Sequence, residues 1–154
     1  MLRLLMTSLN ASAAILTTTL LIYHQVTTWL PLFPWNDVEK YSRRELLMEA
    51  VFNGLLMGTA LVCLLSGNKG FAHWYPLFYF PFLFLGECVD WWIPYFSESF
   101  AKKRKIWDYE TRFGRTIKLI PHRPGKRTPD ANHIVLHCLT VIAAIAVYFD
   151  RFIR

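Results

Sequence analysis

The chain has 154 residues, of which 54% are hydrophobic, 16% aromatic and 18% charged, and its formal net charge is +6. This length allows one domain, and the apolar content excludes a disordered or fibrous chain. Residues 97–132 carry 14 of the 28 Lys, Arg, Asp and Glu residues, which leaves long stretches elsewhere almost uncharged. The distribution indicates a single all-α, polytopic integral membrane domain over residues 1–154.

Four apolar segments are long enough to cross a hydrocarbon layer of roughly 30 Å, which takes about 20 helical residues. They cover residues 4–30, 46–66, 71–96 and 133–153. Continuous apolar runs are typical of membrane helices, whereas a membrane barrel needs many short alternating strands. The sequence therefore predicts a four-helix transmembrane bundle.

The loop between the third and fourth predicted helices, residues 97–132, is strongly basic. Apolar residues recur in it at the spacing of one helical face, namely Ile106, Tyr109, Phe113, Ile117 and Ile120. This pattern predicts a basic amphipathic helix that lies at the membrane interface and is attracted to anionic lipids. No nucleic-acid-binding motif accompanies the charge, so we expect membrane lipids rather than nucleic acid as partners.

The orientation follows from the distribution of basic residues on the two sides of the predicted bundle. The two larger loops hold 13 of the 17 Lys and Arg residues, and the other side holds the remaining four, which include Arg151. Cytoplasmic loops are enriched in Lys and Arg. The count therefore predicts cytoplasmic loops and places both termini on the non-cytoplasmic side of a multi-pass protein.

Ionisable side chains occur near the same end of each predicted helix. In chain order the polar residues of this layer are His24, Glu45, Glu49, Asn53, Glu87, Asp90, Asp130, His133 and His137. At a rise of ~1.5 Å per residue they lie within roughly 15 Å of the cytoplasmic interface. Because charged groups facing lipid are costly, we expect these side chains to face one another in a shared pocket.

This layer suits acid/base chemistry on a lipophilic substrate that enters from the bilayer. A carboxylic acid in an apolar pocket can act as a general acid, and histidine can donate or accept a proton near neutral pH. The candidate catalytic residues are Glu49, Glu87, Asp90, His137 and His24. The candidate substrate-binding residues are Asn53, Trp91, Trp92, Arg112 and Arg115. The pattern is compatible with isomerisation, cyclisation or hydrolysis.

Other interpretations of the same residues stay open. Glu45 and Asp130 begin predicted helices, where an acidic side chain complements the helix dipole. His133 and His137, at i and i+4, form an alternative metal site for a divalent transition metal, although the sequence predicts no cofactor directly. The chain is also compatible with a non-catalytic assembly or immunity-type membrane protein that docks lipid or protein through its basic loop, and with an oligomer.

Overall fold

The structure is a computed structural model that describes residues 2–67, 69–97, 99–100, 109–123 and 125–152, with side chains described from residue 11 onward. Its described residues form helices and no strands, which confirms the all-α prediction. The helical elements are α1 (Leu2–Trp29), η1 (Val38–Lys40), α2 (Arg43–Ser66), α3 (Gly70–Glu87), η2 (Cys88–Trp92), α4 (Ile93–Phe96), α6 (Tyr109–Phe113) and α7 (Ala131–Phe152). Four long segments therefore coincide with the four predicted helices, the third being α3, η2 and α4 in succession.

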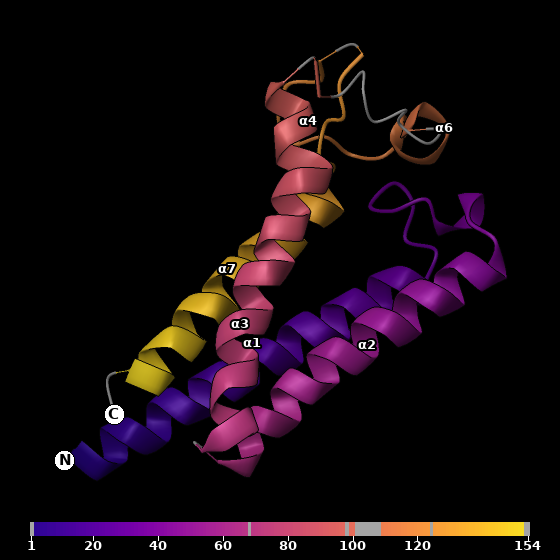
Figure 1. Cartoon of the computed structure of the whole chain (residues 1–154). Coiled ribbons are helices and arrows are strands. Elements are labelled where there is room, and N and C mark those ends of the chain that lie inside the picture. The colour runs from indigo at the N-terminus through magenta and orange to yellow at the C-terminus, as the bar shows by residue number, and fades with distance from the viewer. Residues whose placement is uncertain (1, 68, 98, 101–108, 124, 153–154) are drawn as a thin grey trace.

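The four long segments pack as a ring in which α1 and α3 each contact both α2 and α7. Figure 1 shows that the two termini and the α2–α3 turn lie at one end of the bundle, here called the terminal end. The α1–α2 connection and α6 lie at the opposite end, here called the loop end. Helices α2 and α3 diverge from their shared turn toward the loop end.

The apolar core fills the half of the bundle nearer the terminal end. All four long helices contribute to it, with Ala13, Leu20, Met57, Ala60, Leu64, Phe80, Ala143 and Val147 fully or almost fully buried. The alanines allow the helices to approach closely, and burying each large side chain contributes roughly 1.5–3 kcal/mol. The polar residues predicted to form a layer lie in the other half, above this core.

Large apolar side chains also cover the outside of the bundle. Exposed examples occur on every long helix, such as Ile15 at 63%, Leu65 at 68%, Phe82 at 69% and Ile145 at 51% exposure. Within the described residues, two helices, α2 and α7, are long and apolar enough to cross a membrane.

Arg151 closes the terminal end by binding backbone carbonyl groups. It is 5% exposed and donates from Nη1 to the carbonyl oxygen of Gly67 at 3.1 Å and from Nη2 to that of Ala72 at 3.2 Å. Pro76 has no N–H to bond the Ala72 carbonyl, which lies four residues before it in α3. The sequence count had placed Arg151 among the basic residues outside the apolar layer, but these carbonyl groups hold it inside the fold.

The third helical segment contains a π-helical turn, η2, shortly before Pro94. Pro94 cannot donate to the carbonyl of Asp90, four residues earlier. That carbonyl instead accepts a hydrogen bond from Arg127 Nη1 at 2.7 Å. Such π-helical turns are rare and are frequent at functional sites. In this protein the turn carries both tryptophans that contact the histidines of α7.

The predicted amphipathic helix between the third and fourth long helices is wrong from Gly114 onward. Residues 106–108 lie outside the described residues, and after them helix α6 extends only from Tyr109 to Phe113. Gly114 follows, where a Cβ atom would lie 2.4 Å from the backbone oxygen of Glu110. This close backbone approach favours glycine and turns the chain, so the apolar residues beyond it do not continue the helical face.

Candidate functional site

A cavity of about 470 Å³ lies between the four long segments in the loop-end half of the bundle. Seven of the ten candidate site residues predicted from the sequence line it: His24, Glu49, Asn53, Glu87, Asp90, Trp91 and His137. His133 also lines it, together with apolar residues of α2, α3 and α7. We call this cavity the chamber. Its position confirms that the polar residues of four helices converge, which helical periodicity alone could not establish.

Three residues that line the chamber each have a buried polar atom with no hydrogen-bond partner among the described residues: Tyr79 Oη, Glu87 Oε2 and His137 Nε2. Glu87 and His137 are only 8% and 3% exposed. Leaving such a group unpaired costs about 1–3 kcal/mol. Buried groups of this kind are rare in native proteins, so each requires an explanation in terms of ligand, solvent or function.

The other carboxylate oxygen of Glu87 is bonded to α7. Thr140 Oγ1 lies 2.7 Å from Glu87 Oε1 and 3.1 Å from the carbonyl oxygen of Leu136. A threonine hydroxyl has one hydrogen to donate and can also accept. A protonated Glu87 would therefore satisfy all three groups, with Glu87 donating to Thr140 and Thr140 donating to Leu136.

The ring of His137 is held by Trp92 from the π-helical turn. Trp92 Nε1 donates to His137 Nδ1 at 3.1 Å. An indole nitrogen only donates, so Nδ1 must accept, and the neutral imidazole carries its hydrogen on Nε2. The unpaired Nε2 atom of His137 is therefore a hydrogen-bond donor in the chamber wall. Trp92 itself does not line the chamber but a separate apolar groove between α3 and α7.

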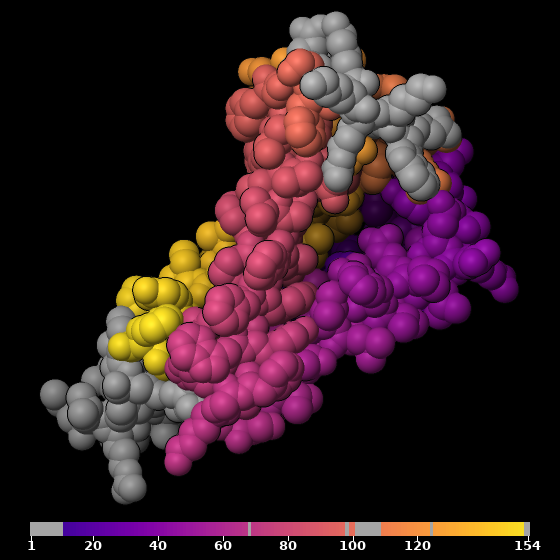
Figure 2. Space-filling model, viewed as in Figure 1, coloured from indigo at the N-terminus to yellow at the C-terminus, as the bar shows by residue number. Residues whose placement is uncertain are grey.

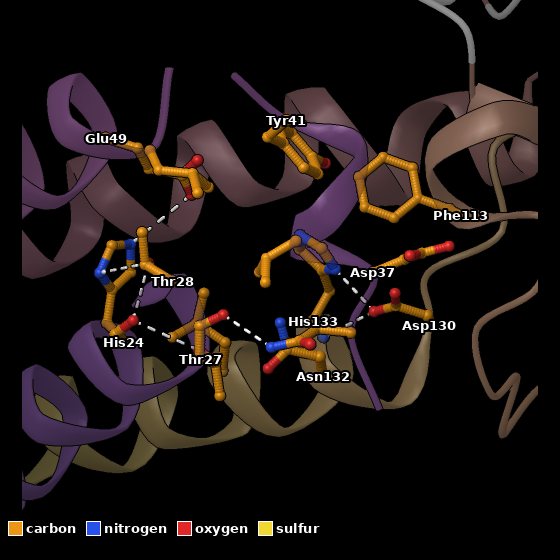
Figure 3. Close-up of a pocket in the computed structure, with 14 residues that line it drawn as sticks. His24, Thr27, Thr28, Asp37, Tyr41, Glu49, Phe113, Asp130, Asn132 and His133 are labelled. Atoms are coloured by element: carbon orange, nitrogen blue, oxygen red, sulfur yellow. Dashed lines mark hydrogen bonds and ion pairs between the residues drawn. The ribbon is translucent and has the colours of Figure 1, made fainter. Parts of the chain in front are cut away.

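A second acid–histidine pair lies on the opposite wall, between α1 and α2. His24 Nε2 is 3.9 Å from Glu49 Oε1, and Thr28 Oγ1 is 3.5 Å from His24 Nδ1. His24 is 5% exposed, whereas half of the Glu49 side chain is accessible. Figure 3 shows the two side chains facing each other beside a smaller cavity of about 60 Å³, to which both residues and His133 contribute.

His133 is fixed by Asp130 and by stacking on Trp91. Asp130 Oδ1 accepts from the His133 backbone N–H at 3.0 Å and lies 2.6 Å from His133 Nδ1, while Oδ2 accepts from Thr116 Oγ1 at 2.9 Å. The Trp91 and His133 rings are 3.9 Å apart. Burial raises the pKa of Asp130, but the charge and hydrogen bonds of His133 and the bond from Thr116 outweigh it and hold the pKa below its usual value. Asp130 thus begins α7, as predicted, and also orients a histidine of the chamber.

The two arginines predicted to bind substrate do not line the chamber. Arg112 donates to Glu45 Oε1 at 2.7 Å, and Arg115 donates to Asp37 Oδ2 at 2.8 Å. The first pair joins α6 to the first turn of α2, and the second joins the chain after α6 to the α1–α2 connection. Bonding to Glu45 raises the pKa of Arg112, so its charge is committed to this structural contact.

Asp90 lies at the rim of the chamber on η2 and is exposed. Its side chain is therefore accessible from outside, unlike that of Glu87 one turn earlier. The two predicted acids of this helical segment therefore differ in burial, Glu87 being buried and Asp90 exposed.

No group of three or more His, Cys, Asp and Glu residues in the described part of the chain has an arrangement that could hold a metal ion. The alternative ligands His133 and His137 have rings 6.2 Å apart. Each uses Nδ1 for a protein contact, which leaves the Nε2 atoms for any ligand.

Several residues of the site were missed or undervalued from sequence. Thr140 and Tyr79 were not singled out, and Asp130 was placed in the polar layer and at the helix start but not among the candidate site residues. The i, i+3 spacing of Asp130 and His133 was the available signal for their pairing. Nothing local indicates that Thr140 meets Glu87, because that contact joins residues 53 positions apart.

Comparisons with protein-family models, curated proteins and solved structures find no match to this chain.

Proposed function

We propose that this protein is a small polytopic membrane enzyme that performs acid/base chemistry on a lipophilic substrate bound in the chamber. The observation that carries the proposal is that three residues lining one cavity, Tyr79, Glu87 and His137, each have a buried polar atom that is unpaired among the described residues. A purely structural polar network would satisfy its own members. Unpaired groups around a cavity of this size are instead suited to bind a ligand.

The apolar exterior supports placing all four long segments in a membrane. Helices α2 and α7 satisfy length and composition criteria on their own. The outward residues of α3 are large and apolar as well, with Phe71, Trp74, Phe78 and Phe82 between 52% and 69% exposed. A patch of this extent is unfavourable in water. With the loop end in the cytoplasm, the arrangement agrees with the excess of basic residues there.

The opening of the chamber favours entry of substrate from the bilayer. Phe52 of α2 and Phe82 of α3 both line the chamber and are 63% and 69% exposed, so they also reach the outer surface. Figure 2 shows a hollow between the column formed by α3 and α4 and the neighbouring α2. A lipophilic molecule could pass between these helices without crossing the aqueous loop end.

The two walls of the chamber suit different steps of proton transfer. Glu87 and His137 offer a carboxyl group and an N–H donor on the α3–α7 wall, where water is excluded. The His24–Glu49 pair on the opposite wall is more accessible and can exchange protons with solvent. In such an arrangement Glu87 protonates or deprotonates the substrate, and His137 stabilises the charge that develops on a substrate oxygen.

The test compares membrane lipid extracts, by mass spectrometry, from cells that express wild-type protein, Glu87→Gln or Glu110→Gln. The last variant is the matched control, since Glu110 is an exposed glutamate on α6. We expect a lipid difference for the wild type and the control that disappears in Glu87→Gln, with unchanged thermal unfolding. A wild-type lipid profile that persists in Glu87→Gln would contradict the proposal, as would wild-type extracts that match those of cells lacking the protein.

A further inference from the structure

The head group of the ligand is constrained by which charges the chamber lacks. Three carboxyl-bearing residues line it, namely Glu49, Glu87 and Asp90, and no lysine or arginine is among its described lining residues. Arg112 and Arg115 form ion pairs elsewhere, and Arg127 donates to the backbone carbonyl of Asp90 and lies over the Trp91 ring.

Two of the three histidines in the wall already have acidic neighbours. His24 is 3.9 Å from Glu49, and His133 is 2.6 Å from Asp130. A positive charge on either ring would thus be matched within the protein. An anionic head group such as a phosphate or carboxylate would find no lysine or arginine among the described residues that line the chamber, and burying it would be costly.

Glu87 and His137 each have a polar atom that is unpaired among the described residues, and both residues line the chamber from the α3–α7 side. Two hydrogen bonds join the helices at this level, from Thr140 to Glu87 and from Trp92 to His137. His137 and Thr140 are one turn apart on the same face of α7. A ligand group bound on this wall would face the side chains of both Glu87 and His137.

The chemistry of these two atoms selects a hydroxyl group. His137 Nε2 carries a hydrogen and needs an acceptor, because Trp92 occupies Nδ1. Glu87 Oε2 is a carboxyl oxygen and accepts from an O–H group. A hydroxyl can accept from the histidine and donate to the glutamate at once, whereas an ammonium cannot accept and a carboxylate cannot donate.

We infer that the chamber binds a neutral lipid alcohol, with its hydroxyl between Glu87 and His137 and its hydrocarbon body among the apolar residues of α2 and α3. This inference rests on the proposed function for its site, and it names the substrate class. Apolar side chains below the pair, such as Met57 and Leu83, provide the surface for the hydrocarbon part.

The experiment uses three probes that share an 18-carbon dibrominated chain and differ only in the head group, which is a primary alcohol, a carboxylic acid or an amine. Bromine quenches tryptophan fluorescence on contact, and Trp91 lines the chamber. Titrations are made at pH 7 on the full chain in lipid nanodiscs. We expect the alcohol to bind at least ~10-fold more tightly than the acid or the amine, since each of these loses one of the two hydrogen bonds.

Two variants locate the binding. Glu87→Leu removes the acceptor and should weaken alcohol binding by about tenfold, whereas Glu110→Gln should leave it unchanged. Equal or tighter binding of the acid or the amine would overturn the inference, and so would an unaltered affinity in Glu87→Leu. If the alcohol binds selectively and its binding depends on Glu87, but cellular lipids do not change, then the inferred ligand class is supported and the proposed catalysis is contradicted.

Discussion

Replacing Glu87 by leucine separates a ligand-binding role from a structural role. In the folded protein Glu87 makes one side-chain hydrogen bond, with Thr140, and keeps one buried oxygen unpaired. Losing the hydrogen bond costs about 1 kcal/mol, and removing the unpaired oxygen recovers about 1–3 kcal/mol. Thr140 stays satisfied by the Leu136 carbonyl at 3.1 Å. We therefore expect Glu87→Leu to be stabilised by about 0–2 kcal/mol while it loses ligand binding.

The measurement is the free energy of unfolding in detergent micelles, followed by tryptophan fluorescence. Met57→Ala in the fully buried core serves as the comparison, because truncating a buried methionine costs about 2–5 kcal/mol. A loss of stability in Glu87→Leu as large as that of Met57→Ala would refute the reasoning. It would show that Glu87 holds the bundle together, and the unpaired oxygen would then carry no functional meaning.

Two further predictions concern the loop end. Tyr109 Oη donates to the Thr128 carbonyl at 2.7 Å and accepts from the Thr128 N–H at 3.2 Å. Tyr109→Phe leaves both backbone groups unpaired and should lower the free energy of unfolding, measured by chemical unfolding, by about 1–3 kcal/mol. An unchanged free energy of unfolding would show that water replaces the hydroxyl. Folding lowers the pKa of Asp130. The ionised Asp130 side chain therefore stabilises the fold above its usual pKa of about 4, and this stabilisation is lost as the pH falls through the lower pKa of the folded state. Melting temperatures recorded from pH 7 to pH 2.5 should therefore fall less steeply for Asp130→Asn than for the wild type, and identical slopes would contradict this assignment.

Local sequence signals were sufficient for the long helices and for the depth of the polar layer. Apolar length set the positions of the four segments, and a fixed rise per residue placed His24, Glu49, Glu87 and His137 at one end. Helix α2 begins at Arg43, before the predicted residue 46, and Ser42 and Glu45 form a capping box at this start. These features depend on residues within a few turns of one another.

The end of α6 and the partners of Arg112 and Arg115 did not follow from helical spacing. Gly114 ended α6 after a single turn, where apolar spacing alone predicted a helix to Ile120. Arg112 and Arg115 pair with Glu45 of α2 and Asp37 of the α1–α2 connection and do not line the pocket. The two arginine contacts join residues 67 and 78 positions apart, which local periodicity does not encode, whereas the end of α6 reflects the local contact of Gly114 with Glu110.

From its sequence alone the protein has four apolar helices with their titratable groups at one level, because hydrophobic length and helical rise are local properties. Only the tertiary structure decided that Thr140 bonds Glu87 and Trp92 bonds His137. Those pairs depend on how far each helix is rotated about its own axis and on where the chain turns at η2. Both are set by packing between helices, and packing determines which oxygen and which nitrogen remain available to a ligand.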